Sequence, residues 1–224
     1  MKPLPPNPSP DRKLLRDAGA LAAAVGVIGI SFGAIGVAEG MPAWAPIAMS
    51  LLVFAGGAQF LAVGLIGAGN PFAAILGGLL INARHVPFGL AIGSAISDRL
   101  GGRLLGAHLL TDESTAFTLA QPDGGRRRRT YWVVAGMLFA AWNIGTVTGV
   151  ALGTAVGDPE TYGLDAAFPA GLLALIMPAL REPRTLAAAV AGAAIALATA
   201  PFLPAGLPVL LALMGTLIAL KENR

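Results

Sequence analysis

Long stretches without a charged residue constrain this chain more than any other feature of its sequence. No Asp, Glu, Lys or Arg occurs from residue 41 to residue 83, and none occurs from 86 to 97. A helix needs about 20 consecutive apolar residues to cross the hydrocarbon core of a bilayer. Charged residues make up only 12% of the chain, whereas soluble domains carry about 25%. The sequence therefore predicts an all-α, polytopic integral membrane protein.

The apolar stretches predict about seven or eight transmembrane helices. Residues 1–17 are rich in proline and then basic, and they predict a disordered cytoplasmic tail. A signal peptide is the competing interpretation, but the apolar segment that follows is long enough to span. Residues 18–125 form the first transmembrane half, with the polar site, and 126–224 the second. The expected spans are 18–38, 44–66, 72–96, 130–156, 163–180, 185–201 and 206–220, with 104–121 ambiguous.

The most unusual polar stretch, NARHVPF at residues 82–88, lies inside an apolar run. Pro87 lacks a backbone N–H and crowds the carbonyl of Ala83, so the helix should bend or break there. The adjacent Arg84 and His85 must face protein or a wet cavity if they lie at mid-bilayer depth. Broken helices that line a cavity form the midplane sites of many transporters. The competing interpretation is a proline kink whose arginine reaches a lipid headgroup.

Two further segments place polar side chains among apolar ones. Gln59 follows a glycine pair in FAGGAQF at residues 54–60. It predicts either a substrate contact or an interhelical hydrogen bond, and the sequence leaves both open. Residues 104–121 have the pattern of an amphipathic helix with His108 and Asp112 on one face.

These polar groups suggest a site for a zwitterion. A buried carboxylate and a buried guanidinium are each costly alone, so we expect Arg84 to pair with Asp112 or Glu113. A free amino acid needs a cation for its carboxylate and an acceptor for its ammonium, and Arg84 and an acid supply both. A histidine or an acid would carry a coupled proton. The candidate substrate-binding or coupling residues are Gln59, Asn82, Arg84, His85, His108, Asp112 and Glu113.

Four consecutive arginines at residues 126–129 test the topology. If the N-terminus is inside and 18–38, 44–66 and 72–96 each cross once, these arginines lie outside, against the positive-inside rule. A crossing by 104–121 restores the rule for them and for the later loops. The positive-inside rule is also satisfied if residues 72–96 form a re-entrant segment that is broken at Pro87. We favour 104–121 within the membrane.

Glycine patterns predict close packing and an internal repeat. Gly29 and Gly33 form a GxxxG motif, which gives a close-packing face. A repeat of about half the chain is typical of transporters, although chance agreement in a Gly/Ala-rich sequence is the alternative. The repeat pairs Gly33 with Gly149, Phe54 with Phe168, and Asn70-Pro71 with Glu182-Pro183.

Several function classes are disfavoured. The chain has no cysteine and only two histidines, with no metal-ligand spacing, so no metal or other cofactor is expected. The net charge of +3 comes from basic residues at the margins of spans, which does not indicate nucleic-acid binding. No GxSxG or HExxH motif supports an intramembrane enzyme. A non-catalytic membrane subunit, whose polar residues serve only helix packing, remains the main alternative.

Three motifs carry a resemblance to a known family. FAGGAQF at 54–60, NARH at 82–85 and LTDE at 110–113, in that order, resemble the AzlC family, the large subunits of branched-chain amino acid exporters. The resemblance covers about residues 15–220. Two positions depart from the family pattern: Gly57 stands where alanine is common, and Phe88 where an aromatic hydroxyl would be familiar.

The resemblance implies a function beyond what composition and spacing indicate. It implies a multi-pass protein of the bacterial inner membrane that exports leucine, isoleucine and valine and is not an enzyme. It also implies a partner, a small hydrophobic subunit of the AzlD type. We expect transport to be driven by the proton gradient.

Overall fold

The computed structural model describes residues 10–67, 69–122, 124–156, 173, 177, 179–203 and 207–217, and every regular element within these ranges is helical. The all-α expectation is confirmed for this part of the chain. The first helix begins at residue 10, so the last part of the predicted tail is helical. The elements are α1 (Pro10–Ala38), α2 (Trp44–Leu52), α3 (Gly56–Gly67), α4 (Pro71–Asn82), α5 (His85–Ile96), α6 (Leu100–His108), α7 (Asp112–Leu119), α8 (Gly125–Val156), η2 (Ala179–Arg181), α10 (Pro183–Thr199), α11 (Leu207–Ala212) and η3 (Leu213–Gly215).

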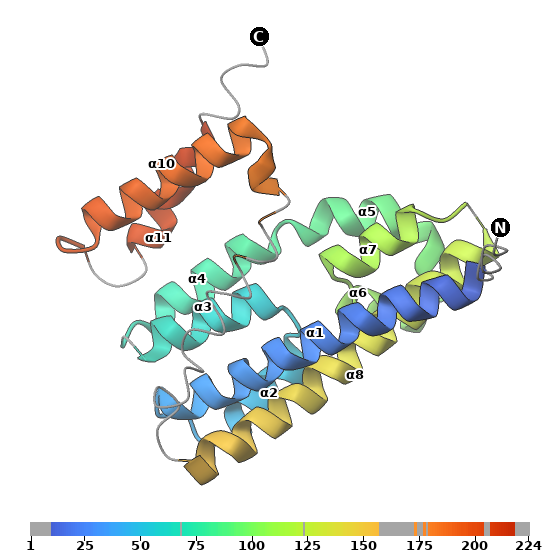
Figure 1. Cartoon of the computed structure of the whole chain (residues 1–224), viewed down its shortest axis with the longest axis horizontal. Coiled ribbons are helices and arrows are strands. Elements are labelled where there is room, and N and C mark those ends of the chain that lie inside the picture. The colour runs from blue at the N-terminus through green and yellow to red at the C-terminus, as the bar shows by residue number, and fades with distance from the viewer. Residues whose placement is uncertain are drawn as a thin grey trace, which may run out of the picture.

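The two long helices α1 and α8 lie side by side and run in the same direction (Figure 1). Near their first turns Arg129 donates a hydrogen bond to Asp11 at 3.0 Å. Towards their last turns Ala34 lies against Gly153. The starts of α1 and α8 are therefore at one end of the molecule, and their last turns are at the other.

Glycines allow the backbones of α1 and α8 to touch. A Cβ added to Gly33 would overlap the carbonyl oxygen of Thr146, and one added to Gly149 would overlap that of Ile30. A Cβ added to Gly29 would lie 2.7 Å from the carbonyl oxygen of Trp142, which is also too close. The close-packing face predicted from the GxxxG motif is therefore confirmed, because only residues without a side chain permit this approach.

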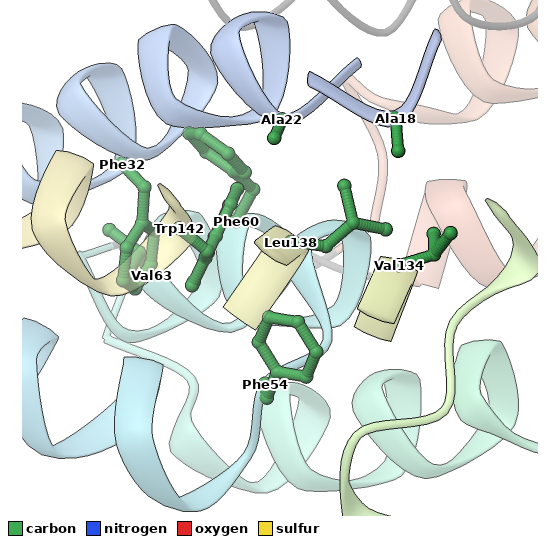
Figure 2. Packing of buried hydrophobic residues seen from close by; sticks show 9 residues of the cluster. All are labelled: Ala18, Ala22, Phe32, Phe54, Phe60, Val63, Val134, Leu138 and Trp142. Atoms are coloured by element: carbon green, nitrogen blue, oxygen red, sulfur yellow. The ribbon is translucent and has the colours of Figure 1, made fainter. Parts of the chain in front are cut away.

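The main hydrophobic core fills the space between α1, α3 and α8 (Figure 2). Phe32 of α1 stacks on Trp142 of α8 with ring centroids 5.6 Å apart, and Phe60 of α3 meets Phe32 edge-on at 5.4 Å. Such aromatic pairs add to the free energy gained by burying apolar area. They hold the first turns of α3 against the middle of α8. The other members of the core are Ala18, Ala22, Phe54, Val63, Val134 and Leu138.

Helices α2 and α3 form a hairpin that returns to the end of the molecule from which it enters. Pro46, in the first turn of α2, lies so close to Gly36 of α1 that a Cβ there would contact it. After the turn, α3 ends at Gly67, which lies against the side chain of Glu39 just beyond α1. Both ends of the hairpin therefore lie near the last turns of α1.

The turn of this first hairpin reaches the middle of α8. There Gly56 packs against the ring of Trp142, and Phe54 adopts a φ of +43° as the chain reverses. We predicted a single span over 44–66. That prediction is wrong, because the chain reverses direction between α2 and α3 instead of crossing.

Helices α4 and α5 together run from one end of the molecule to the other, with a bend of 46° between them. Asn70 caps α4 by accepting a hydrogen bond from the backbone N–H of Ala73 at 3.1 Å. At the far end of the pair, Trp132 in the second turn of α8 donates a hydrogen bond to the carbonyl of Ile96 at 2.9 Å. The bend falls at residues 83–84, so the break predicted near Pro87 is confirmed.

Helices α6 and α7 form a second hairpin, which enters from the end where α8 begins. Asp98, two residues before α6, accepts a hydrogen bond from Arg128 near the start of α8 at 2.8 Å. After α7, the carbonyl of Gln121 accepts a hydrogen bond from Arg127 at 3.1 Å. Both ends of this hairpin are therefore near the start of α8.

The turn of the second hairpin also reaches the middle of α8, where the ring of His108 lies 5.9 Å from that of Phe139. Helix α7 starts after Thr111, which forms a reciprocal capping box with Ser114. The single helix and the crossing that we favoured for 104–121 are therefore wrong, because the cap starts a new helix that turns back.

The end of the molecule where α1 and α8 begin is named here the basic end, because it carries Arg12, Arg16, Arg99, Arg103 and the arginines at 126–129. Arg128 donates a hydrogen bond to Asp98 at 2.8 Å, which lowers the pKa of that carboxyl. The favoured topology had separated Arg99 and Arg103 from the later arginines. In the structure all of these arginines lie at the basic end. The reason is that residues 44–66 fold back, whereas residues 72–96 run from one end of the molecule to the other.

By length and composition, α1 and α8 can each cross a membrane. The bent α4–α5 pair is also long and apolar enough to cross if its two helices are counted as one span. The described residues thus provide up to three spans, and the predicted seven or eight are not reached there. Most of the expected span 163–180 lies outside the described residues. Helix α10 corresponds to the expected 185–201, and α11 with η3 to the start of 206–220. These helices pack on one another where Gly192 lies against Ala212.

Candidate functional site

Three interruptions of helical structure border one cavity of about 110 Å³ beside the middle of α8. They are the turn before α3, the bend between α4 and α5, and the turn before α7. A single water needs about 10–15 Å³ measured with the same probe. The cavity therefore has room for a small organic ligand, and its walls come from segments far apart in the sequence.

One side of the cavity is charged. Arg84 Nε lies 3.2 Å from Asp112 Oδ1, so the ion pair expected between Arg84 and an acid is present, with Asp112 as the acid. His85 Nε2 lies 3.7 Å from the same oxygen, and its Nδ1 lies 3.2 Å from the carbonyl of Asn82. The side chains of the pair are 46% and 40% exposed. Both charges are therefore accessible to a ligand and are not sealed in the core.

Glu113 also lines this charged side. Asp112 and Glu113 are the first two residues of α7, where the positive end of the helix dipole favours ionised carboxylates. Because Asp112 faces Arg84, Glu113 is the acid that remains to meet a cationic group in the cavity. The capping box of α7 thus positions two carboxylates at the cavity, of which Asp112 is paired with Arg84.

The opposite side of the cavity is apolar. Side chains from α1, α3 and α8 form it together with the glycine pair at residues 56–57. A Cβ added to Gly57 would meet no atom within 4 Å, whereas one added to Gly56 would lie 3.1 Å from Cη2 of Trp142. Gly57 therefore leaves space open in the cavity. The apolar side chains are Val25, Ile28, Phe54, Phe60, Leu138 and Trp142.

Three of the predicted site residues do not line the cavity. Gln59 is fully buried behind the first turn of α3, where its Oε1 accepts a hydrogen bond from the N–H of Ala55 at 3.1 Å. His108 Nε2 lies 2.8 Å from the carbonyl of Leu51 and joins the turns of the two hairpins. Asn82 is the last residue of α4, directly before the bend, and its carbonyl lies 3.2 Å from His85 Nδ1. The structure thus gathers Arg84, His85, Asp112 and Glu113 on the cavity wall, which the other three do not line.

Sequence reasoning missed Trp142, which is 4% exposed and lies on the wall of the cavity. An isolated tryptophan in an apolar span normally predicts a core or interfacial residue, so nothing nearby in the sequence marked it. No group of three or more His, Asp or Glu in the described part of the chain is arranged to hold a metal ion.

The fold and the site together define a helical membrane protein with a partly charged cavity between interrupted helices. Residues 20–156 match the AzlC protein family. The chain belongs to that family, and the matched range contains all the cavity residues named above.

Two relatives show the similarity in more detail. The branched-chain amino acid transport protein AzlC of Bacillus subtilis is 26% identical over 201 residues, which cover 87% of this chain and 79% of that protein. An uncharacterized membrane protein of Helicobacter pylori is 27% identical over 154 residues, 67% of each chain. No solved structure matches this chain.

Proposed function

We propose that this protein exports branched-chain amino acids across the bacterial inner membrane, as the large subunit of a two-component exporter coupled to the proton gradient. The observation that carries the proposal is the cavity, which has an accessible guanidinium and carboxylates on one side and an apolar wall on the other. A branched-chain amino acid has the same division into a charged and an apolar part. The name of the Bacillus subtilis relative, a branched-chain amino acid transport protein, supports the substrate class.

In this proposal each group of the substrate has a partner of complementary chemistry. Arg84 meets the carboxylate, for which its planar fork of donors is suited. Glu113 accepts from the ammonium, while Asp112 keeps Arg84 in place. The branched side chain lies against the apolar wall, where Gly57 leaves it room.

His85 is the group best placed to carry a coupled proton. It faces Asp112 from the bend between α4 and α5, and histidine changes charge near neutral pH. Protonation of His85 would compete with Arg84 for the same carboxylate. Proton binding would thereby change how firmly Arg84 is held for the substrate.

The basic end of the molecule is cytoplasmic in this proposal, because lysine and arginine are enriched on that side of membrane proteins. Many large apolar side chains of α4 and α5 are exposed, including Phe72, Ile75, Leu79 and Leu90. Lipid and a small hydrophobic partner of the AzlD type would cover such surfaces.

Counterflow of labelled leucine in proteoliposomes tests the proposal. The chain purified with its partner subunit should exchange leucine for internal unlabelled leucine, and a pH gradient should drive net flux in the absence of exchange. The chain purified without its partner subunit should show little leucine exchange and little net flux. Absence of leucine exchange by the complex would overturn the proposed substrate, and net flux that is indifferent to the pH gradient would overturn the coupling.

A further inference from the structure

The first turn of α3 faces the cavity and presents backbone N–H groups to it. The first backbone N–H groups of a helix have no acceptor within the helix, and they carry the positive end of its dipole. Gly56 and Gly57 are the first residues of the twelve-residue helix α3, and both line the cavity. Neither has a Cβ to shield its N–H from a ligand.

Gln59 brings an additional donor to this turn. Its side chain is completely buried, and its Oε1 accepts from the N–H of Ala55 at 3.1 Å, which fixes the orientation of the carboxamide. If the Oε1 and Nε2 atoms of Gln59 exchanged places, the Nε2 donor would face the N–H donor of Ala55 and no hydrogen bond could form. The Nε2 group therefore lies at the start of α3, and no described residue accepts a hydrogen bond from it.

Trp142 supplies a second donor of the same kind. It packs against Gly56 on the cavity wall and is 4% exposed. Its indole Nε1 is buried, and within the described ranges it has no hydrogen-bond partner. Buried tryptophan N–H groups nearly always have one, because an unpaired buried donor loses its hydration without compensation.

We propose, on the basis of the function proposed above, that the start of α3 binds the carboxylate of the amino acid through the backbone N–H groups of Gly56 and Gly57 and the indole N–H of Trp142, with the buried Gln59 carboxamide behind them. All of these groups are donors, so the ligand atom that meets them must be an acceptor. A carboxylate oxygen also suits the positive end of a helix dipole. Arg84, on the charged side of the same cavity, meets the second oxygen of that carboxylate. Trp142 and the first turn of α3 are thereby specificity-determining, since an amine without a carboxylate leaves their donors unpaired.

Trp142→Phe tests this assignment, because it removes one N–H and keeps a ring in the aromatic cluster. The Kd for leucine, measured on the purified protein, should rise about tenfold or more, the loss expected for a hydrogen bond to a charged group. The melting temperature without leucine should stay the same or rise, because an unpaired buried donor disappears. Binding of isopentylamine, which is leucine without its carboxylate, should not weaken.

Trp132→Phe is the matched control on the same helix. Trp132 lies outside the cavity and donates to the carbonyl of Ile96 at 2.9 Å. This substitution should lower the melting temperature and leave the Kd for leucine unchanged. Trp142→Phe should therefore weaken leucine binding without a loss of stability, whereas Trp132→Phe should lower stability without a change in leucine binding.

Gln59→Glu gives a second, independent variant. Its carboxylate can still accept from the N–H of Ala55, so α3 should keep its cap, but the new negative charge should repel the carboxylate of leucine. Leucine binding should fall below detection. Parental affinity for leucine in both Trp142→Phe and Gln59→Glu would overturn the carboxylate site and leave the proposed function standing. A parental protein that does not bind leucine would overturn both.

Discussion

At the scale of single residues, Arg84 is set apart, because no other Lys or Arg occurs between Arg16 and Arg99. It lies at the bend between α4 and α5, far along the chain from the basic residues at its margins. An isolated guanidinium at this depth would be costly. The 3.2 Å contact with Asp112 reduces that cost and leaves both groups accessible from the cavity.

Substitutions of Arg84 separate a substrate site from a packing contact. Arg84→Lys keeps the charge and loses the fork of donors, so folding should be intact and leucine flux reduced. Arg84→Gln should abolish flux and cost about 1 kcal/mol of stability, because Asp112 loses its counter-ion in a partly exposed pair. Adding Asp112→Asn should recover part of that stability and none of the flux. Flux and thermal unfolding are measured in one membrane preparation, and a parental rate for Arg84→Gln would remove Arg84 from the site.

At the scale of helices, the contact between α1 and α8 depends on positions that cannot carry a side chain. Gly149→Ala should destabilise the protein by about 1–3 kcal/mol, because the new Cβ overlaps the carbonyl of Ile30 in a packed interface. Gly136→Ala is the matched control on the same helix, since a Cβ there meets no atom within 4 Å. It should be neutral or slightly stabilising, as alanine is the better helix former. Thermal unfolding in mild detergent compares the two, and equal melting temperatures would contradict the glycine contact.

At the scale of the whole molecule, the parallel arrangement of α1 and α8 determines the topology. The chain must return to the basic end between these helices, and among the described helices between them the α4–α5 pair does so. The contacts also have a two-fold character: Gly33 meets Thr146 and Gly149 meets Ile30. Gly149 follows Gly33 by 116 residues, and Thr146 follows Ile30 by the same 116 residues. This exchange supports the internal repeat, which stays a prediction, and favours its parallel form.

Single cysteines introduced into this cysteine-free chain test the topology in whole cells. Ala43→Cys lies beyond the last turn of α1, whereas Gly101→Cys and Gly125→Cys lie at the basic end. An impermeant thiol reagent should label the first and spare the other two until the cells are opened. Labelling of Gly101→Cys with protection of Gly125→Cys would instead indicate a crossing by 104–121.

Much of the local structure was predictable because its causes are local. The absence of charge over long stretches indicated membrane helices, Pro87 indicated the break beside Arg84, and Gly29 and Gly33 indicated a close-packing face. The need of a buried guanidinium for an acid limited its partner to Asp112 or Glu113. Each of these inferences depends on a neighbouring residue or on the cost of leaving a charge unpaired.

Only the tertiary structure decided where the chain turns and which polar residues meet. An apolar run of 23 residues can cross a bilayer or fold back within protein, and residues 44–66 fold back because α1 and α8 give their turn a packed core. His108 and Asp112 share a helical pattern, yet the cap at Thr111 separates them. Trp142 reaches the cavity only because α8 packs against α3. These outcomes depend on contacts between segments that are distant in the sequence, and a local pattern of residues carries no information about such contacts.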